Sequence, residues 1–272
     1  MSGAVRTPVL FIHGMWLHAS SWQPWIQLFQ EAGYAPIAPG WPGEARCVSR
    51  ARELPELVAN KGVDDLLAHY ELIVKSLASE PILIGHSFGG LLAEKMLGRG
   101  LGRAAIAISP AQIKGVMTLP FAQLRAGFPA LGNPLNKSRS VALTAEQFRY
   151  AFGNAISQEE SDELFRKWSI PSPARGLFEV AFANFTIGAA SKVDTHNSSR
   201  GPLLLISATA DHTVPDVVTQ STFRQYRHST SLTELVQLEG RGHSLTIDRN
   251  WRDVADTCLE WLQAQGLGAV QA

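Results

Sequence analysis

The hydrophobic positions of this 272-residue chain fall into two kinds of pattern. Short uninterrupted apolar runs, bounded by glycine or proline, are typical of strands buried on both faces of a parallel sheet. Longer stretches in which apolar residues recur every three or four positions predict amphipathic helices. Because the two patterns alternate along most of the chain, the sequence predicts an α/β fold, with a mostly parallel sheet and helices on both faces.

Six segments have the strand pattern, and five segments between or after them have the helix pattern. The strand pattern covers residues 9–12, 34–39, 82–84, 104–108, 203–206 and 235–238. The helix pattern covers residues 20–33, 64–77, 88–99, 216–227 and 250–265. Ser20 is a candidate N-cap for the first of these helices. Pro36 and Pro39 place the second strand near a sheet edge. We therefore expect six parallel strands, and we leave residues 44–62 without an assigned element.

Residues 111–200 differ from the rest, because no continuous apolar run occurs among them. Thr144 and Ser157 are each followed three residues later by Gln or Glu, which is the spacing of a capping box. Each therefore predicts the start of a helix, and a third helix is expected over residues 174–185. This segment is predicted to be a helical insert in the sheet.

We divide the chain accordingly into two units. Residues 1–110 and 201–272 form the predicted core domain, and residues 111–200 form a helical lid, or cap. Eight of the chain's 12 phenylalanines lie in the lid: Phe121, Phe128, Phe148, Phe152, Phe165, Phe178, Phe182 and Phe185. These rings either pack against one another as the lid's own core or line a pocket for an apolar substrate.

The composition narrows the classes of function. With 45% hydrophobic residues and 18% charged residues, the chain resembles an ordinary globular protein. Lys plus Arg and Asp plus Glu both number 24, so nothing suggests a nucleic acid or an anionic membrane surface as a partner. Cys47 and Cys258 are too few for a disulfide framework. No signal peptide or membrane span is visible, and we expect a cytoplasmic protein.

A strand, a tight turn and a helix meet at the sequence Gly85-His86-Ser87-Phe88-Gly89. The pattern Gly-x-Ser-x-Gly alone is weak evidence, because a glycine-rich turn can match it by chance. Here the buried strand before the pattern and the amphipathic helix after it supply the context of a nucleophile elbow. The glycines leave room for Ser87 to adopt a strained backbone and expose its hydroxyl. Ser87 is therefore the candidate nucleophile.

A serine hydroxyl needs a base, and the base needs an acid that orients it. Four histidines were compared as the base: His13, His86, His212 and His243. We favour His243, because it follows the last predicted strand in a glycine-rich loop. His13 and His86 are more typical of packing or hydrogen-bonded turn residues, and His212 adjoins an aspartate.

Asp211 is the favoured acid, because it lies in the loop that leaves a core strand. Ligand sites in open α/β sheets form beyond the carboxyl ends of the strands. The alternatives Asp194, Asp216 and Asp248 are more typical of helix caps or surface charges. No His-x-x-x-His or Cys-x-x-Cys spacing is present, so neither a metal nor another cofactor is expected.

The chain order Ser87, Asp211, His243 is that of the α/β-hydrolase superfamily. Together with His13-Gly14 after the first strand, these motifs make the chain resemble a lidded, serine-nucleophile member similar to carboxylesterases and lipases. The resemblance covers the predicted core and places the lid after the strand at the family's sixth position. It implies a Ser-His-Asp triad and an oxyanion hole formed by the backbone N–H groups of Met15 and Phe88.

The expected reaction is hydrolysis of a carboxylic ester of a small apolar substrate through an acyl-enzyme. Trp16 and His18 follow the first strand and are predicted to line the pocket. The loop at residues 40–44 departs from the family pattern, since it lacks the acidic residue and the serine found there in many lidded members.

Other functions on the same scaffold stay open from the sequence. Lactonases, C–C bond hydrolases, perhydrolases and hydroxynitrile lyases use the same triad, and a lyase would use His243 as a base without an acyl-enzyme. A ligand receptor built on the hydrolase scaffold is a further alternative from another class. Oligomeric state is not predicted.

Overall fold

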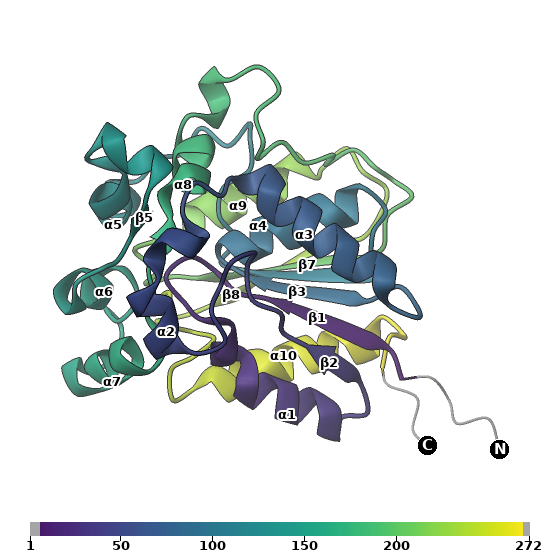
Figure 1. Ribbon diagram of the computed structural model, residues 1–272. Helices are drawn as coiled ribbons and strands as arrows, with labels where there is room; N and C mark the ends of the chain where they lie inside the picture. Colours follow the sequence, from purple (N-terminus) through teal and green to yellow (C-terminus); the bar gives the residue numbers. More distant parts are fainter. Residues whose placement is uncertain (1–5, 269–272) are drawn as a thin grey trace.

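The apolar runs form a six-stranded sheet in the computed structural model, which describes residues 6–268 (Figure 1). The strands are β1 (Pro8–Ile12), β2 (Ala35–Ile37), β3 (Ile82–His86), β4 (Ala104–Ile108), β7 (Leu203–Ala208) and β8 (Thr233–Leu238). Their order is β2-β1-β3-β4-β7-β8, and every neighbouring pair is parallel. The proline-containing β2 lies at one edge, as predicted. Residues 1–5 and 269–272 of the predicted core domain lie outside the described residues.

Helices cover both faces of the sheet, which confirms the predicted α/β fold class (Figure 1). One face carries α1 (Gln23–Glu31) and α10 (Trp251–Ala264), and the other carries α3 (Val63–Ser76), α4 (Phe88–Gly98) and α9 (Asp216–Gln225). Side chains alternate along a strand. Val9 and Phe11 of β1 therefore pack on the face covered by α1 and α10, and Leu10 and Ile12 pack on the face covered by α3, α4 and α9. The continuous apolar runs in the sequence therefore reflect burial on both faces of the sheet.

The segment between β4 and β7 is mainly helical and lies at one end of the sheet (Figure 1). Its elements are α5 (Phe121–Leu131), β5 (Ser140–Val141), α6 (Ala145–Ala151), α7 (Gln158–Trp168), β6 (Ser172–Pro173) and α8 (Ala174–Ala181). Backbone bonds from His18 N to Trp168 O and from Ile170 N to Trp16 O join this segment to the loop that leaves β1. The helical insert therefore packs at the carboxyl ends of the strands, the edge at which ligand sites form.

Local signals in the sequence were partly right about where the helices begin. Thr144 forms the expected capping box at α6, and the Ser157 side chain accepts a hydrogen bond at the start of α7. Ser20, in contrast, does not cap the first helix. That segment begins as a 3-10 turn, Ala19–Trp22, whose cap is the side chain of His18.

Two further helices carried no recognisable signal in the sequence. α5 exposes Phe121 and Phe128, so its apolar residues do not mark a single buried face. Residues 44–62, which had no assigned element, contain α2 (Val48–Glu53) and a 3-10 turn, Pro55–Val58. Within residues 6–268, no helix is both long and apolar enough to cross a membrane.

A buried carboxyl group lies on α4, the helix that follows the elbow. The Tyr226 hydroxyl donates a 2.7 Å hydrogen bond to Glu94 Oε2, while Glu94 Oε1 has no partner among the described residues. The guanidinium of Arg200 lies 5.0 Å from the centre of the Tyr226 ring. Burial raises the pKa of Glu94 to about 8, against smaller opposing effects of Tyr226 and Arg200. The folded protein therefore keeps this carboxyl protonated at pH values where the unfolded chain ionises it.

Glu94→Gln should remove a pH-dependent loss of stability. A folded-state pKa of about 8 against an ordinary value of 4.5 means that the stabilising contribution is complete below pH 4.5. It is lost as the pH rises to 8, by roughly 3–5 kcal/mol. Urea unfolding of the wild type and Glu94→Gln between pH 4.5 and 8.5 should show the variant gaining relative stability by that amount. The raised pKa of Glu94 would be contradicted if the free energies of unfolding of the wild type and the variant changed in parallel with pH. An equal gain in the exposed control Glu260→Gln would contradict it as well.

Candidate active site

Ser87 occupies a strained turn between β3 and α4. Its backbone angles are φ 54° and ψ −117°, a region that non-glycine residues rarely adopt. A side chain at Gly85 could not be accommodated, because its Cβ would lie 2.1 Å from the carbonyl oxygen of Gly89. The turn therefore depends on the two glycines of the Gly-x-Ser-x-Gly pattern. It leaves the Ser87 side chain at the carboxyl edge of the sheet.

The loop that leaves β1 passes directly beside the serine. A Cβ on Gly14 would lie 2.8 Å from Ser87 Cβ, so only glycine allows this approach. Met15 follows Gly14, and Phe88 follows Ser87 as the first residue of α4. Because the first residues of a helix have no partner for their N–H groups inside the helix, the Phe88 N–H is available at the positive end of the helix dipole. The two predicted oxyanion-hole residues thus flank the serine on adjacent elements.

His243 and Asp211 form a short, fully buried pair. His243 Nδ1 lies 2.6 Å from Asp211 Oδ2, and neither side chain is exposed to solvent. The other oxygen of Asp211 accepts 2.8 Å bonds from the N–H groups of Thr213 and Val214. The carboxylate is thereby fixed in one orientation. His243 Nε2, on the far side of the ring, is buried and has no hydrogen-bond partner within residues 6–268.

His243 lies against the elbow itself. Its ring centre is 4.6 Å from that of His86, the residue before Ser87, and 4.9 Å from that of Phe152 in the insert. Burial, together with the nearby His243, lowers the pKa of His86 well below its ordinary value. His86 therefore stays neutral and packs beside His243 without adding a competing charge.

The other three aspartates have different partners. Asp216 begins α9 and accepts a bond from Ser207 Oγ, and the exposed Asp194 accepts a bond from the His196 N–H. Asp248 is buried at the start of α10: it is 2% exposed, pairs with Arg241 at 2.8 Å and accepts a 3.0 Å bond from the N–H of Asn250, the N-cap residue of that helix. The structure brings Asp211, and none of these three, to His243.

A narrow apolar cavity of about 90 Å³ lies between the insert and the core. Its walls are Trp16, Gln112, Leu119, Gln123, Leu124, Gly127, Leu131, Leu177, Val180, Ala181 and Thr213. Three of these residues neighbour the catalytic candidates: Trp16 follows Met15, Thr213 donates to Asp211, and Gln112 follows Ala111, whose N–H donates to Ser87 O at 2.9 Å. Ser87, Asp211 and His243 are not among the lining residues, so the cavity lies beside the segments that carry them.

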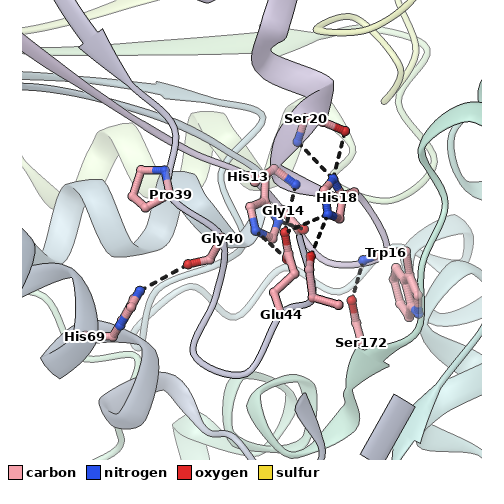
Figure 2. A network of polar contacts seen from close by, with 12 residues as sticks. His13, Gly14, Trp16, His18, Ser20, Pro39, Gly40, Glu44, His69 and Ser172 are labelled. Atoms are coloured by element: carbon pink, nitrogen blue, oxygen red, sulfur yellow. Dashed lines mark hydrogen bonds and ion pairs between the residues drawn. The ribbon is translucent and has the colours of Figure 1, made fainter. Parts of the chain in front are cut away.

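Trp16 and His18, the two predicted pocket residues, have different surroundings. Trp16 forms part of the cavity wall, and its N–H donates a 2.6 Å bond to Ser172 Oγ of the insert (Figure 2). His18 is not part of that wall. Its ring nitrogens lie 2.7 Å from Ser20 Oγ and 2.9 Å from the Ala45 carbonyl oxygen.

A buried carboxylate, Glu44, joins both ends of the loop that follows β1 (Figure 2). Its Oε2 lies 3.0 Å from His13 Nε2, and its Oε1 accepts a 3.0 Å bond from Ala19 N and lies 3.6 Å from His18 Nε2. The ring of Trp41, from the loop at residues 40–44, stacks on His13 at 4.9 Å. The carboxylate of Glu44, at the end of this loop, therefore contacts protein groups.

The charge of Glu44 is sustained by its neighbours. Burial alone would raise its pKa, but the imidazole of His13, the Ala19 N–H and the more distant His18 together lower it below the ordinary value. Glu44 is thus an ionised group inside the protein that fixes the segment containing Met15. This role could not be predicted from the sequence, because the contacts join residues more than twenty positions apart.

No group of three or more His, Cys, Asp or Glu side chains is placed to hold a metal ion within residues 6–268. The chemistry that the arrangement can support from its own residues is nucleophilic attack by a serine, with an adjacent imidazole–carboxylate pair.

Comparison with known proteins agrees with the fold. A model of the alpha/beta hydrolase family matches residues 9–257, which is most of the chain, and the protein belongs to this family. Among curated protein sequences, none matches this chain.

Solved structures with a similar fold include several esterases and lipases. A monoacylglycerol lipase from Paleococcus ferrophilus has 19% sequence identity and a TM-score of 0.66, over 95% of this chain and 94% of that one. A methylesterase from Arabidopsis has 17% identity and a TM-score of 0.65, over 95% of this chain and 99% of that one. Polyneuridine aldehyde esterase has 17% identity and a TM-score of 0.64, over 94% and 99% of the respective chains. At these identities the likeness shows the shared fold.

Glu44→Gln should destabilise the protein at neutral pH. The variant keeps an oxygen for the Ala19 N–H but loses the charge that faces His13, at a cost of about 1–3 kcal/mol. Because the folded pKa of Glu44 is lowered, its contribution is present above the ordinary carboxyl pKa and is lost as the pH falls through the folded value. Urea unfolding should therefore show a smaller difference in the free energy of unfolding between the wild type and Glu44→Gln at pH 4 than at pH 7.

The matched control is Glu53→Gln, whose ion pair with Arg50 is more than half exposed. Glu53→Gln should lower the free energy of unfolding by less than about 0.5 kcal/mol at either pH. An equal effect of the two substitutions would contradict the buried role of Glu44.

Proposed function

We propose that this protein is a serine hydrolase that cleaves a carboxylic ester of a small apolar substrate through an acyl-enzyme. The observation that carries the proposal is the buried 2.6 Å pair of His243 and Asp211 beside the strained Ser87. Supporting it are the family membership and an apolar cavity lined by Trp16 and Thr213, which adjoin the segments that carry these residues. The proposed class of reaction is that of the carboxylic ester hydrolases.

In the first half-reaction, Ser87 Oγ attacks the ester carbonyl carbon. His243 Nε2 takes the serine proton, and Asp211 accepts the Nδ1–H bond and stabilises the imidazolium. The carbonyl oxygen becomes an oxyanion, which the N–H groups of Met15 and Phe88 would bind. Each such donor is worth about 3–4 kcal/mol in comparable sites. When the intermediate collapses, the bond to the leaving alcohol breaks and His243 returns its proton to the alcohol oxygen.

In the second half-reaction, water replaces the alcohol. His243 removes a proton from the water as it attacks the acyl carbonyl, and the same two N–H groups bind the new oxyanion. The bond to Ser87 Oγ then breaks, the serine recovers its proton from His243, and the carboxylic acid leaves. The partner implied is a small-molecule ester, and no step requires a cofactor.

The insert is proposed to act as a lid, with residues 1–110 and 201–272 as the core domain and 111–200 as the lid domain. Four leucines of the insert line the cavity, at positions 119, 124, 131 and 177. No phenylalanine lines it. Two of the insert's phenylalanines, Phe148 and Phe152, stack on each other in the buried cluster that the insert shares with the sheet, and four others are exposed. The cavity is smaller than the roughly 300–1,000 Å³ typical of drug-sized ligand sites, which favours a short acyl or alcohol group.

Ser87→Ala should lower kcat for p-nitrophenyl butyrate by at least about 10⁴-fold, because the variant has no nucleophile. A fluorophosphonate should label the wild type on the peptide that contains Ser87 and should leave the variant unlabelled. The control is Ser76→Ala, an exposed serine on α3, which should retain full activity. Activity that persists in Ser87→Ala would overturn the proposal, as would a requirement for a metal shown by loss with EDTA and recovery with zinc.

A further inference from the structure

The apolar cavity contains polar groups that the proposed reaction does not use. Eight of its eleven lining residues are apolar or glycine, and the others are Gln112, Gln123 and Thr213. No charged side chain lines it. Thr213 donates its hydroxyl to the carbonyl oxygen of Ala151 at 2.7 Å. The two glutamines are the polar side chains that remain to be explained.

The amide oxygen of Gln112 is buried without a partner. The residue is 6% exposed, and this oxygen, shielded from solvent, has no hydrogen-bond partner within residues 6–268. The amide oxygen of Gln123 is in the same state. Buried polar groups in native proteins nearly always have partners, so two unpaired amide oxygens on residues that line one cavity call for an explanation. A ligand that enters the cavity can supply the missing hydrogen bonds.

Both glutamines belong to the insert, eleven positions apart. Gln112 lies at the start of the insert and follows Ala111, whose N–H donates to the backbone carbonyl of Ser87. Gln123 lies on α5. Of the two, Gln112 is therefore the one joined through its neighbour to the backbone of the candidate nucleophile. An acyl or alcohol chain in this cavity would meet apolar walls along most of its length and an amide close to the scissile bond.

The chemistry of an unpaired carboxamide oxygen defines what it would bind. It accepts hydrogen bonds, and its NH₂ donates them, so a hydroxyl or a secondary amide can satisfy it. A carboxylate or ammonium group would lose its hydration in a cavity without a compensating charge, which is strongly unfavourable. We propose that Gln112, assisted by Gln123, selects ester substrates whose apolar chain carries one neutral hydrogen-bond donor, a hydroxyl or an amide N–H, near the ester. This assignment rests on the proposed function for the position of the ester.

The test compares methyl hexanoate with matched derivatives of the same chain length. These carry a hydroxyl on the second, third or last carbon, an internal amide (methyl N-propionylglycinate), or a terminal carboxylate (monomethyl adipate). At least one hydroxyl or amide derivative should exceed methyl hexanoate in kcat/KM by about tenfold or more, and monomethyl adipate should be the poorest. The hydroxyl and amide arms distinguish the two donor types.

Gln112→Met is the decisive variant, because methionine has a similar volume and no hydrogen-bonding amide. It should reduce the preference for the polar derivative to about onefold, because kcat/KM for that derivative falls more than kcat/KM for methyl hexanoate. The thermal midpoint should stay the same or rise by about 2 °C, since an unpaired buried amide has been removed. Gln123→Met should reduce the preference for the polar derivative less than Gln112→Met does. Gln27→Met, on the exposed side of α1, should leave that preference unchanged.

Three outcomes would overturn the assignment. One is a wild type that prefers methyl hexanoate to every polar derivative, and another is an equal loss for all substrates in Gln112→Met. A marked fall in thermal midpoint in that variant would indicate a structural role in place of recognition.

A binding measurement separates this assignment from the proposed function. In the Ser87→Ala background, the preferred derivative should raise the thermal midpoint more than methyl hexanoate does, and Gln112→Met should abolish the difference. If the wild type hydrolyses no ester but this binding preference is present, the proposed hydrolysis fails while the role of Gln112 stands. If esters are hydrolysed without any such preference, the proposed hydrolysis stands and the role of Gln112 in selecting the substrate is wrong.

Discussion

Three backbone segments approach one another closely at Ser87, and this approach determines how the candidate active site is built. A Cβ on Gly89 would lie 2.1 Å from the carbonyl oxygen of Ile12, and one on Gly14 would meet Ser87 itself. Since such distances exclude any side chain, glycine at these positions lets β1, β3 and α4 converge on one point. The serine, the Met15 segment and the first N–H of α4 are then neighbours without further adjustment, and the geometry of the candidate active site follows from the packing of the core.

The insert contributes to this geometry as well as covering it. Its short β5–β6 pair holds Trp16 through two bonds, one from the backbone N–H to Ser172 Oγ and one from the indole to the Val141 carbonyl oxygen. Phe152 of the insert packs against the His243 ring. On the core side, Glu44 fixes the same loop through His13. The segment around Met15 is therefore held from both sides, which is the preorganisation that stabilisation of an oxyanion requires.

Much of the core could be predicted from the sequence, because burial on both faces leaves continuous apolar runs that few other structures produce. The chain order of Ser87, Asp211 and His243 likewise followed from strand-end positions. What the sequence did not reveal depends on long-range contacts. His18 looked like a pocket residue by its place after β1, yet Glu44, twenty-six positions away, draws it into a buried network. The unpaired amide oxygen of Gln112 can be recognised only in the folded insert, which forms most of the cavity wall.

The central claim is that Ser87 carries the acyl group during turnover, and rapid-quench mass spectrometry of the intact protein tests it most directly. Mixed with excess p-nitrophenyl butyrate and quenched in acid within milliseconds, the protein should gain one butyryl mass, mapped by digestion to the peptide containing Ser87. The adduct should appear together with a burst of about one equivalent of p-nitrophenol. A butyryl group on another residue would contradict this role of Ser87. So would steady release of p-nitrophenol with no adduct, provided that added hydroxylamine also traps no acyl group.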